Sequence, residues 1–448
     1  MIMQTKDLTQ GSILRNIFSF SLPYMLAYFL QILYGLADLF VIGRYDGVDA
    51  TTSVSNGAQV MYMVTAMIIG LAMGTTVMTA HAVGAGDKAR MGRAIGNTIS
   101  AFALLSVVLT GILLLLRSHV VQWVATPSEA VGGTIDYLTV CFLGIPFIVG
   151  YNVIASIFRG MGDARTPMYL VGVACVVNIA LDFLFIGALG LGSVGAALGT
   201  TLSQGFSVLV AAVAIARHRQ AMHLCRESFR LDRRILGGLL KVGLPISLQD
   251  GFIQVSFLFI MVIANLRGLH DAAAVGIVEK FIGLLFIVPS SMLSTVSAVS
   301  AQCLGAGKGE RARRTMRSAI CITAGFGLAA SILFQLVPQW PISLFTSDAR
   351  VIASGADYLQ SYVWDCALAG IHFCFSGYFT ACGYSIVSFV HNVISILCAR
   401  LPLSYVLSQA YPDTLYPMGL ASPAGSVLSV LVCVGAYIWL RRSGKLAG

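Results

Sequence analysis

Apolar stretches separated by short polar breaks follow one another along the chain from Leu14 to Leu440. A helix needs about 20 apolar residues to cross a hydrocarbon core of roughly 30 Å, and each stretch reaches that length. The pattern predicts an all-α polytopic membrane protein with about 12 transmembrane helices. The expected helices occupy residues 14–42, 51–81, 94–117, 131–158, 166–188, 194–216, 236–266, 272–302, 315–337, 352–380, 385–408 and 417–440.

The composition supports this prediction and argues against a water-soluble fold. The 448 residues are 57% hydrophobic and 10% charged, whereas a soluble domain is about 25% charged. Most of the 10 cysteines lie inside apolar stretches, without a Cys-x-x-Cys pair or a His/Cys cluster, so we expect no disulfide framework, metal site or cofactor. The glycine pairs beginning at Gly84 and Gly305 lack the context of a phosphate loop, and no hydrolase motif occurs, so we do not expect an enzyme.

The net charge of +9 raises the question of nucleic-acid binding, but the positions of the basic residues argue against it. Of the 28 Lys and Arg residues, 22 lie at alternate connections between the expected helices and only 4 at the remaining connections. The positive-inside rule then places both termini and the central 217–234 loop in the cytoplasm. We therefore expect a multi-pass protein of the plasma (inner) membrane, surrounded by lipid.

The second half of the chain repeats the first at a nearly constant offset. Asp136-Tyr137-Leu138 recurs as Asp357-Tyr358-Leu359, at 357 − 136 = 221, and Leu22-Pro23 recurs as Leu244-Pro245, at 244 − 22 = 222. Six helices in each half make the repeat parallel, and such halves commonly enclose a central cavity and rock against each other. The sequence predicts two pseudo-symmetric six-helix lobes, 1–216 and 235–448, joined by a basic cytoplasmic linker, 217–234.

Charged residues inside a membrane are costly and are candidates for function. The first half has two, Asp38 and Asp182, and Asn178 lies four residues before Asp182, on the same face of a helix. A carboxyl group beside an amide in such a place could bind and release a proton or help to coordinate a cation. The alternative is that each Asp only forms hydrogen bonds that pack neighbouring helices.

Pro23 lies upstream of Asp38 and favours a bend, so it is a candidate hinge. The second half has Ile260 and Leu403 at the positions that correspond to Asp38 and Asp182, so the lobes differ in chemistry. It has charges of both signs, and Arg400 is expected to form an ion pair with a neighbouring carboxylate. The charged residues within its expected helices are Asp250, Glu279, Lys280, Asp365 and Arg400.

In the order and spacing of its motifs, nearly the whole chain resembles the multidrug and toxic compound extrusion (MATE) family of secondary transporters. The matching motifs are Pro23, Asp38-Leu-Phe-Val-Ile-Gly-Arg44, Gly84-Ala-Gly86, Phe158-Arg-Gly-Met-Gly-Asp-Ala-Arg-Thr-Pro167, Asn178-x3-Asp182 and Gly190-Leu-Gly192-x2-Gly195-Ala-Ala197. The resemblance implies two lobes arranged as a V and export of cationic or polyaromatic compounds in exchange for protons or sodium.

The resemblance also implies roles for particular residues. Asp38, Asn178 and Asp182 match the family's acidic site for the coupling ion, with Asn152 and Thr200 as neighbours. Some members also use second-lobe carboxylates, but here the seventh helix has Gln254, with Asp250 a turn earlier, and Asp365 in the tenth matches loosely. This departure favours first-lobe, proton-driven exchange. Further polar residues are candidates for lining the substrate cavity, namely Gln31, Tyr34, Gln204 and Gln254.

Three functions remain open. The leading hypothesis is a secondary active multidrug efflux transporter that acts as a monomer on cationic, amphipathic small molecules, with H⁺ or Na⁺ as the coupling ion. The second is a flippase for a lipid-linked precursor, because related flippase families share the two-lobe frame. The third is a membrane receptor or scaffold, in which the deep carboxylates would have no obligatory role.

Overall fold

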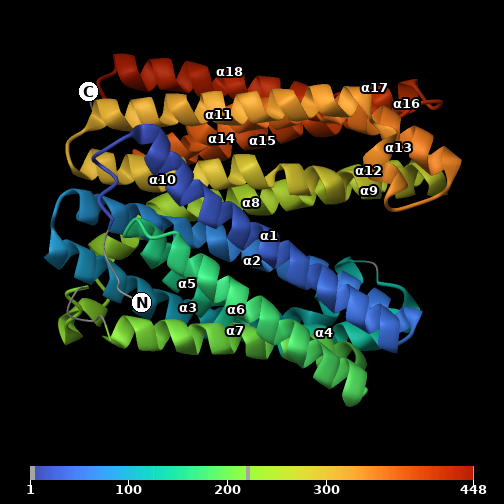
Figure 1. The fold of residues 1–448 in the computed structure, drawn as a ribbon, viewed down its shortest axis with the longest axis horizontal. Helices are drawn as coiled ribbons and strands as arrows, with labels where there is room; N and C mark the ends of the chain where they lie inside the picture. Colours follow the sequence, from blue (N-terminus) through green and yellow to red (C-terminus); the bar gives the residue numbers. More distant parts are fainter. Residues whose placement is uncertain (1–5, 125, 218–221, 447–448) are drawn as a thin grey trace. The chain divides into compact units, whose positions relative to one another are not determined.

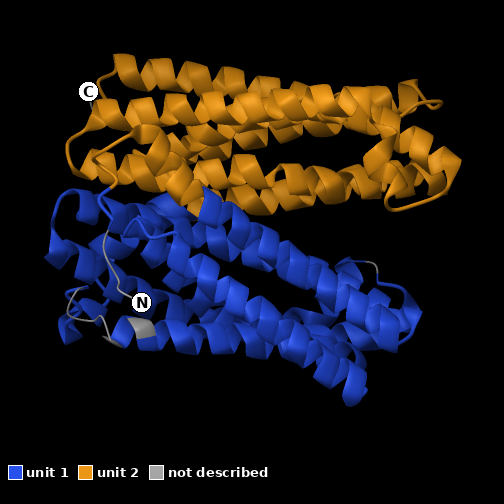
Figure 2. Cartoon of the chain, viewed as in Figure 1, with its two compact units in different colours: residues 1–7, 22–243 blue, residues 8–21, 244–448 orange. Residues whose placement is uncertain are grey.

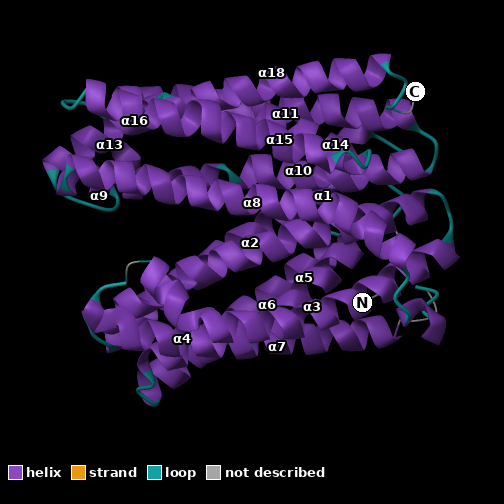
Figure 3. Ribbon diagram, turned by 180° about the vertical axis from the view of Figure 1, so that it is seen from behind, coloured by secondary structure: helices purple, strands orange, loops and turns teal. Residues whose placement is uncertain are grey.

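A computed structural model describes residues 6–124, 126–217 and 222–446, which form helices joined by short loops, with no strand among them (Figures 1 and 3). Ten helical stretches in this part of the chain are long and apolar enough to cross a membrane, and one bent pair of helices makes an eleventh. The predicted all-α polytopic membrane fold is confirmed.

The chain divides into two compact units, which Figure 2 shows in different colours. Unit 1 comprises Met1–Asp7 and Leu22–Gly243, and unit 2 comprises Leu8–Ser21 and Leu244–Gly448. The described part of the expected linker 217–234, residues 217 and 222–234, thus belongs to unit 1, and residues 218–221 lie outside the described residues. Each unit has its own buried core, and the landmarks of the sequence repeat occupy equivalent places, because Leu138 and Leu359 are both fully buried.

The helices and single turns of unit 1 follow α1, which spans Ile13–Tyr45. They are α2 (Val48–Gly84), α3 (Lys88–Trp123), η1 (Ser128–Ala130), α4 (Val131–Leu143), α5 (Ile145–Gly160), α6 (Arg165–Asp182), η2 (Phe183–Ala188), α7 (Gly192–Arg217) and η3 (Arg226–Phe229). Here η2 is a stretch of π-helix, a wide turn that often marks a functional site.

Unit 2 contains most of α8, which spans Arg233–Arg267, and the helices after it. They are α9 (Leu269–Leu285), α10 (Ile287–Gly305), α11 (Gly309–Leu336), α12 (Gln339–Ser343), α13 (Ala349–Tyr362), α14 (Asp365–Ala381), α15 (Ser385–Ser395), η4 (Ile396–Arg400), α16 (Leu401–Ala410), α17 (Tyr416–Gly419) and α18 (Ala421–Arg442).

Two of the 12 expected helices are missing from the ten unbroken apolar stretches. The expected 131–158 helix is the pair α4 and α5, which meet at a 50° bend, where Pro146 in the first turn of α5 has no backbone N–H to donate. The expected 352–380 helix is divided between α13 and α14 at the corresponding point, and it is absent from the eleven apolar stretches. With 14 and 17 residues, α13 and α14 are each too short to cross a membrane alone, so the count falls below 12.

The first helix of each half passes from one unit to the other at a proline. α1 leaves unit 2 between Ser21 and Leu22, and α8 leaves unit 1 between Gly243 and Leu244, so both transitions fall at the repeated Leu-Pro pair. Each starting segment is fastened where it begins. In unit 2, Arg311 donates hydrogen bonds to the carbonyl oxygens of Gln10 and Gly11 at 2.8 and 2.9 Å.

In unit 1, the start of α8 packs directly on the backbone of α2. A Cβ atom at Gly74 would overlap the carbonyl oxygen of Leu239, and a Cβ atom at Gly243 would overlap the carbonyl oxygen of Leu71. Glycine at both positions therefore allows the two helices to approach closely. The repeated proline pair thus lies next to anchored helical segments in both halves.

Arg267, the last residue of α8, fastens the loop between α16 and α17 in unit 2. Its Nε lies 2.8 Å from the carboxylate of Asp271, and its terminal nitrogens donate to four carbonyl oxygens at 2.7 to 3.2 Å. The planar guanidinium group makes all these contacts at once, which a lysine ammonium group cannot do. The carbonyl acceptors belong to Ser408, Tyr411, Pro412 and Thr414.

We predict that Arg267→Lys lowers the free energy of unfolding by roughly 2 kcal/mol, because the charge is kept but several charge-assisted hydrogen bonds are lost. Thermal unfolding of the purified protein in detergent measures the change. Arg44→Lys, a substitution of an exposed arginine at the end of α1, is the matched control and should leave the unfolding temperature unchanged. Equal effects of both substitutions would contradict a clamping role.

Candidate functional site

The predicted acidic residues come together in the interior of unit 1. Asp38 of α1 is 4% exposed, and Asn178 and Asp182 of α6 are 1% and 0% exposed. Because Asn178 and Asp182 are one turn apart, their side chains lie on one face of α6. The carboxyl groups of Asp38 and Asp182 lie close enough to interact directly, and Asn178 also lies within reach of Asp38. The structure thus joins residues that are 144 positions apart (182 − 38).

Helix α7 completes this cluster. Thr200 Oγ1 donates a hydrogen bond of 3.1 Å to Asp38 Oδ2. A Cβ atom at Gly199 would overlap Asp182 Oδ1, so only glycine leaves room for the carboxyl group where it stands. The turn that brings α7 back beside α6 contains Gly190 and Gly192, whose φ angles of 63° and 54° favour glycine. The Gly190-Leu-Gly192 motif therefore positions Gly199 and Thr200.

The cluster has more oxygen atoms than protein donors. Asp38 Oδ1, both carboxyl oxygens of Asp182 and both polar atoms of Asn178 are buried and form no hydrogen bond with another described residue. No ion pair joins either carboxyl group to a described Lys, Arg or His. Buried carboxyl oxygens are normally met by a donor or a cation, so this site has the chemistry to hold a proton or a small cation.

Two of the residues predicted to line a substrate cavity lie next to the acidic cluster, and the others do not. Tyr34 lies close to both Asp38 and Gln204, whereas Gln31 is half-buried and forms no hydrogen bond with the described residues of the cluster. Asn152 is buried on α5, but its amide donates to the Ile148 carbonyl oxygen at 2.8 Å and does not reach the carboxyl groups.

Gln254 and Pro23 lie elsewhere. Gln254 lies on the part of α8 that belongs to unit 2, so it is not part of the unit 1 cluster. Pro23 lies on α1 at the transition between units, 15 residues before Asp38 (38 − 23).

Several neighbours of the cluster were not predicted. Tyr137 and Cys141 of α4 and Cys175 of α6 interact electrostatically with Asp38. Tyr137 belongs to the repeated Asp-Tyr-Leu landmark and packs on Gly57 of α2. The landmark and the four-residue spacing of Tyr137 and Cys141 were the available signals, but neither indicates which other helix they face.

The ion pair expected for Arg400 is wrong. Arg400 forms no ion pair with Asp365 or Glu279; instead it donates a hydrogen bond of 2.6 Å to Tyr362, and its guanidinium lies 4.7 Å from the centre of the Phe257 ring. Tyr362 in turn donates to Glu279 at 3.4 Å. A tyrosine hydroxyl therefore stands between the two charges.

Two buried histidines of unit 2 were also missed. His391 shares hydrogen bonds with Ser376 and Ser429 at 2.7 and 3.2 Å, and His372 shares one with Ser426 at 3.3 Å. Serine partners meet both ring nitrogens of His391 and the Nε2 atom of His372, whose Nδ1 atom is buried without a hydrogen bond to a described residue. These contacts fit a role in holding α14, α15 and α18 together. The sequence did not single out these two histidines, because neither lies close to a charged residue along the chain.

Comparison with known proteins identifies the family. The MatE family matches residues 23–184 and 245–406, two segments that each begin at one of the repeated prolines. The chain belongs to the MatE family, a family of membrane transporters and not of enzymes. The predicted resemblance is confirmed.

Relatives and solved structures agree with this assignment. The chain is 26% identical over 447 residues to the "Probable multidrug resistance protein YoeA" of Bacillus subtilis, covering 98% of this chain and 96% of the relative. It is 22% identical over 434 residues to the "Multidrug export protein MepA" of Staphylococcus saprophyticus, covering 94% and 91%. A solved structure described as "MATE in the straight conformation" superposes with a TM-score of 0.89 at 24% identity, covering 99% of this chain and 98% of that one.

We predict that Gly199→Ala impairs transport without unfolding the protein, because the added methyl group must displace the Asp182 carboxyl group. Dye efflux from cells that express the variant should fall by about tenfold, since small misplacements of a reacting group carry large rate penalties. Gly205→Ala on the same helix is the matched control, because its Cβ would meet only the Phe147 ring at an ordinary 3.5 Å. Comparable efflux by both variants would show that the position of Asp182 is unimportant.

Proposed function

We propose that this protein is a multidrug efflux transporter that exports cationic or polyaromatic small molecules by antiport with a cation bound at Asp38, Asn178 and Asp182. The observation that carries the proposal is the pair of buried carboxyl groups on α1 and α6, which no described basic residue neutralises. Relatives named as multidrug resistance and multidrug export proteins support the substrate class.

The physical basis of coupling is the repulsion between two carboxylates in a poorly solvated place. When both are ionised they repel each other, and one bound proton or cation removes the repulsion. Asp38 already accepts a hydrogen bond from Thr200, so the remaining oxygens of the pair are the ones that a coupling ion would meet. Binding of the ion therefore changes the force between α1 and α6.

A proton is the coupling ion that this geometry supports best. Two facing carboxyl groups can share a single proton, as paired carboxyl groups do in other proteins. A proton needs only one oxygen of each carboxyl group, whereas sodium would also need further oxygen ligands, such as those of Asn178 and Thr200. A cationic substrate would then compete with the proton for the same negative charge, which links uptake of one to release of the other.

We predict that Asp38→Asn and Asp182→Asn each abolish gradient-driven transport. In proteoliposomes that contain the wild-type protein, an imposed proton gradient should drive efflux of a fluorescent cationic dye, and a sodium gradient should not. Asp49→Asn, which alters an exposed carboxylate in the first turn of α2, is the matched control and should transport normally. Normal gradient-driven efflux by Asp182→Asn would refute the proposed coupling site. Wild-type efflux driven only by a sodium gradient would show that the coupling ion is sodium and not a proton.

A bend at Pro23 could change when the force between the carboxyl groups of α1 and α6 changes. Proline removes one backbone hydrogen bond and favours bending, and Pro23 lies where α1 changes unit. Pro245 occupies the same position in α8, whose residue equivalent to Asp38 is Ile260. Only the first half therefore has a carboxyl group at this distance beyond the proline.

We predict that Pro23→Ala lowers the maximal rate of dye efflux several-fold while dye affinity stays the same, because the restored hydrogen bond stiffens α1. Pro245→Ala, the symmetry-related control, should change the rate by less than about twofold, because α8 has Ile260 at the position equivalent to Asp38. Initial efflux rates over a range of dye concentrations measure both quantities. Equal slowing by the two substitutions would show that bending at the prolines serves both halves alike and is unrelated to Asp38.

A further inference from the structure

The segment between α7 and α8 is held on the surface of unit 1 as a strap, which we define as residues 222–232. Asn97 of α3 fixes it at two points: Nδ2 donates to the Ser228 carbonyl oxygen at 3.1 Å, and Oδ1 accepts from the Asp232 backbone N–H at 2.6 Å. A Cβ atom at Gly96 would overlap the Ser228 carbonyl, so the strap touches the α3 backbone. The strap is part of the folded unit, with defined neighbours.

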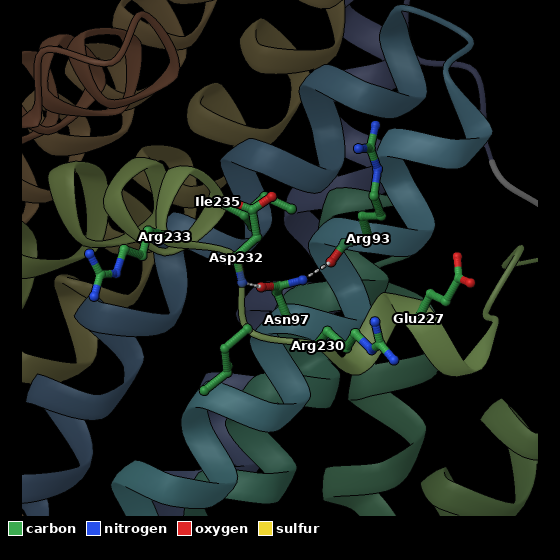
Figure 4. A pocket seen from close by; sticks show the side chains of 8 residues that line it. Arg93, Asn97, Glu227, Arg230, Asp232, Arg233 and Ile235 are labelled. Atoms are coloured by element: carbon green, nitrogen blue, oxygen red, sulfur yellow. Dashed lines mark hydrogen bonds between the residues drawn. The ribbon is translucent and has the colours of Figure 1, made fainter.

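A pocket of about 410 Å³ opens where the strap, α3 and the start of α8 meet (Figure 4). In this view Arg93 and Arg230 lie to the right of Asn97, and Arg233 lies to the left. The remaining lining residues are Glu227, Leu231, Asp232 and Ile235.

Three arginines and two carboxylates, Glu227 and Asp232, line the pocket, which leaves one net positive charge (3 − 2 = 1). Arg93, Arg230 and Arg233 are exposed, and no ion pair joins them to another described residue. Asp232 is already engaged, because its Oδ1 accepts the Arg234 backbone N–H at 2.8 Å in the first turn of α8. Guanidinium groups match phosphate oxygens in shape and charge, so an anionic phosphate group is the ligand that this lining favours.

The sequence predicts that the pocket lies near the membrane surface. Arg93 directly precedes the expected membrane-spanning stretch 94–117, and Arg233 lies three residues before the expected stretch 236–266. Leu231, at 49% exposed, adds apolar surface beside the arginines. The distribution of basic residues predicts that this is the cytoplasmic side, where anionic lipids gather.

We propose that this pocket binds the headgroup of an anionic phospholipid, with Arg93, Arg230 and Arg233 contacting the phosphodiester and Leu231 and Ile235 lying against the lipid's glycerol and upper acyl chain. Free phosphate shares the headgroup chemistry, but it makes no use of the apolar residues. The site is separate from the acidic cluster of unit 1 and does not depend on the proposed coupling mechanism.

Native mass spectrometry of the full-length protein in detergent tests this site. Phosphatidylglycerol, phosphatidylcholine and inorganic phosphate are added in separate titrations to the wild type and to the variant Arg93→Gln, Arg230→Gln, Arg233→Gln. The control variant Arg441→Gln, Arg442→Gln, Lys445→Gln removes the same charge from the C-terminal end of the chain, which is predicted to lie on the same side of the membrane. We expect the first phosphatidylglycerol to bind at least about tenfold more weakly to the pocket variant and within about twofold of wild type to the control.

Phosphatidylcholine binding should be the same in all three proteins, and millimolar phosphate should not displace phosphatidylglycerol. Equal weakening by the two triple variants, or no weakening by the pocket variant, would overturn the site. Binding of phosphate without preferential binding of phosphatidylglycerol would overturn the lipid assignment. Thermal unfolding shows whether the triple variant folds. If it does not, the single variant Arg230→Gln replaces it, and this variant should bind phosphatidylglycerol about threefold more weakly than the wild type.

Discussion

The burial of two carboxyl groups close together, which repel each other whenever both are ionised, is the main physical constraint on unit 1. Asp38 and Asp182 come from helices far apart in the sequence, and both lie inside a fold that has no described basic side chain to pair with them. An uncompensated pair of charges in such a place would destabilise the fold, so it is retained where something binds there. Thr200 and Gly199 shape the pair from the α7 side.

The two halves repeat the same helix order, but their buried charged residues have different partners. In unit 2 the Arg400 guanidinium reaches Glu279 through the Tyr362 hydroxyl, so charges of opposite sign lie in one connected network. Ile260 and Leu403 replace the two carboxyl groups of unit 1. The repeated backbone thus carries two buried carboxyl groups without a described basic partner in one half, and an arginine, a tyrosine and a glutamate joined by hydrogen bonds in the other.

The apolar stretches and the repeat predicted the fold well, because membrane crossing depends mainly on local length and composition. The four-residue spacing predicted that Asn178 and Asp182 share a face, but only the family resemblance connected them with Asp38. Gly199 and Tyr137 escaped prediction because their roles depend on which helices pack together. The Arg400 ion pair was wrong because sequence shows the signs of charges and not the tyrosine that separates them.

The claim that the carboxyl pair couples ion and substrate is tested most directly by counting protons as substrate binds. A cationic dye is added to purified protein in weakly buffered detergent solution, and a pH indicator records the protons released. The account predicts about one proton released per dye bound by the wild type, and almost none by Asp182→Asn. Dye binding with no proton release by the wild type, or with equal release by Asp182→Asn, would contradict it.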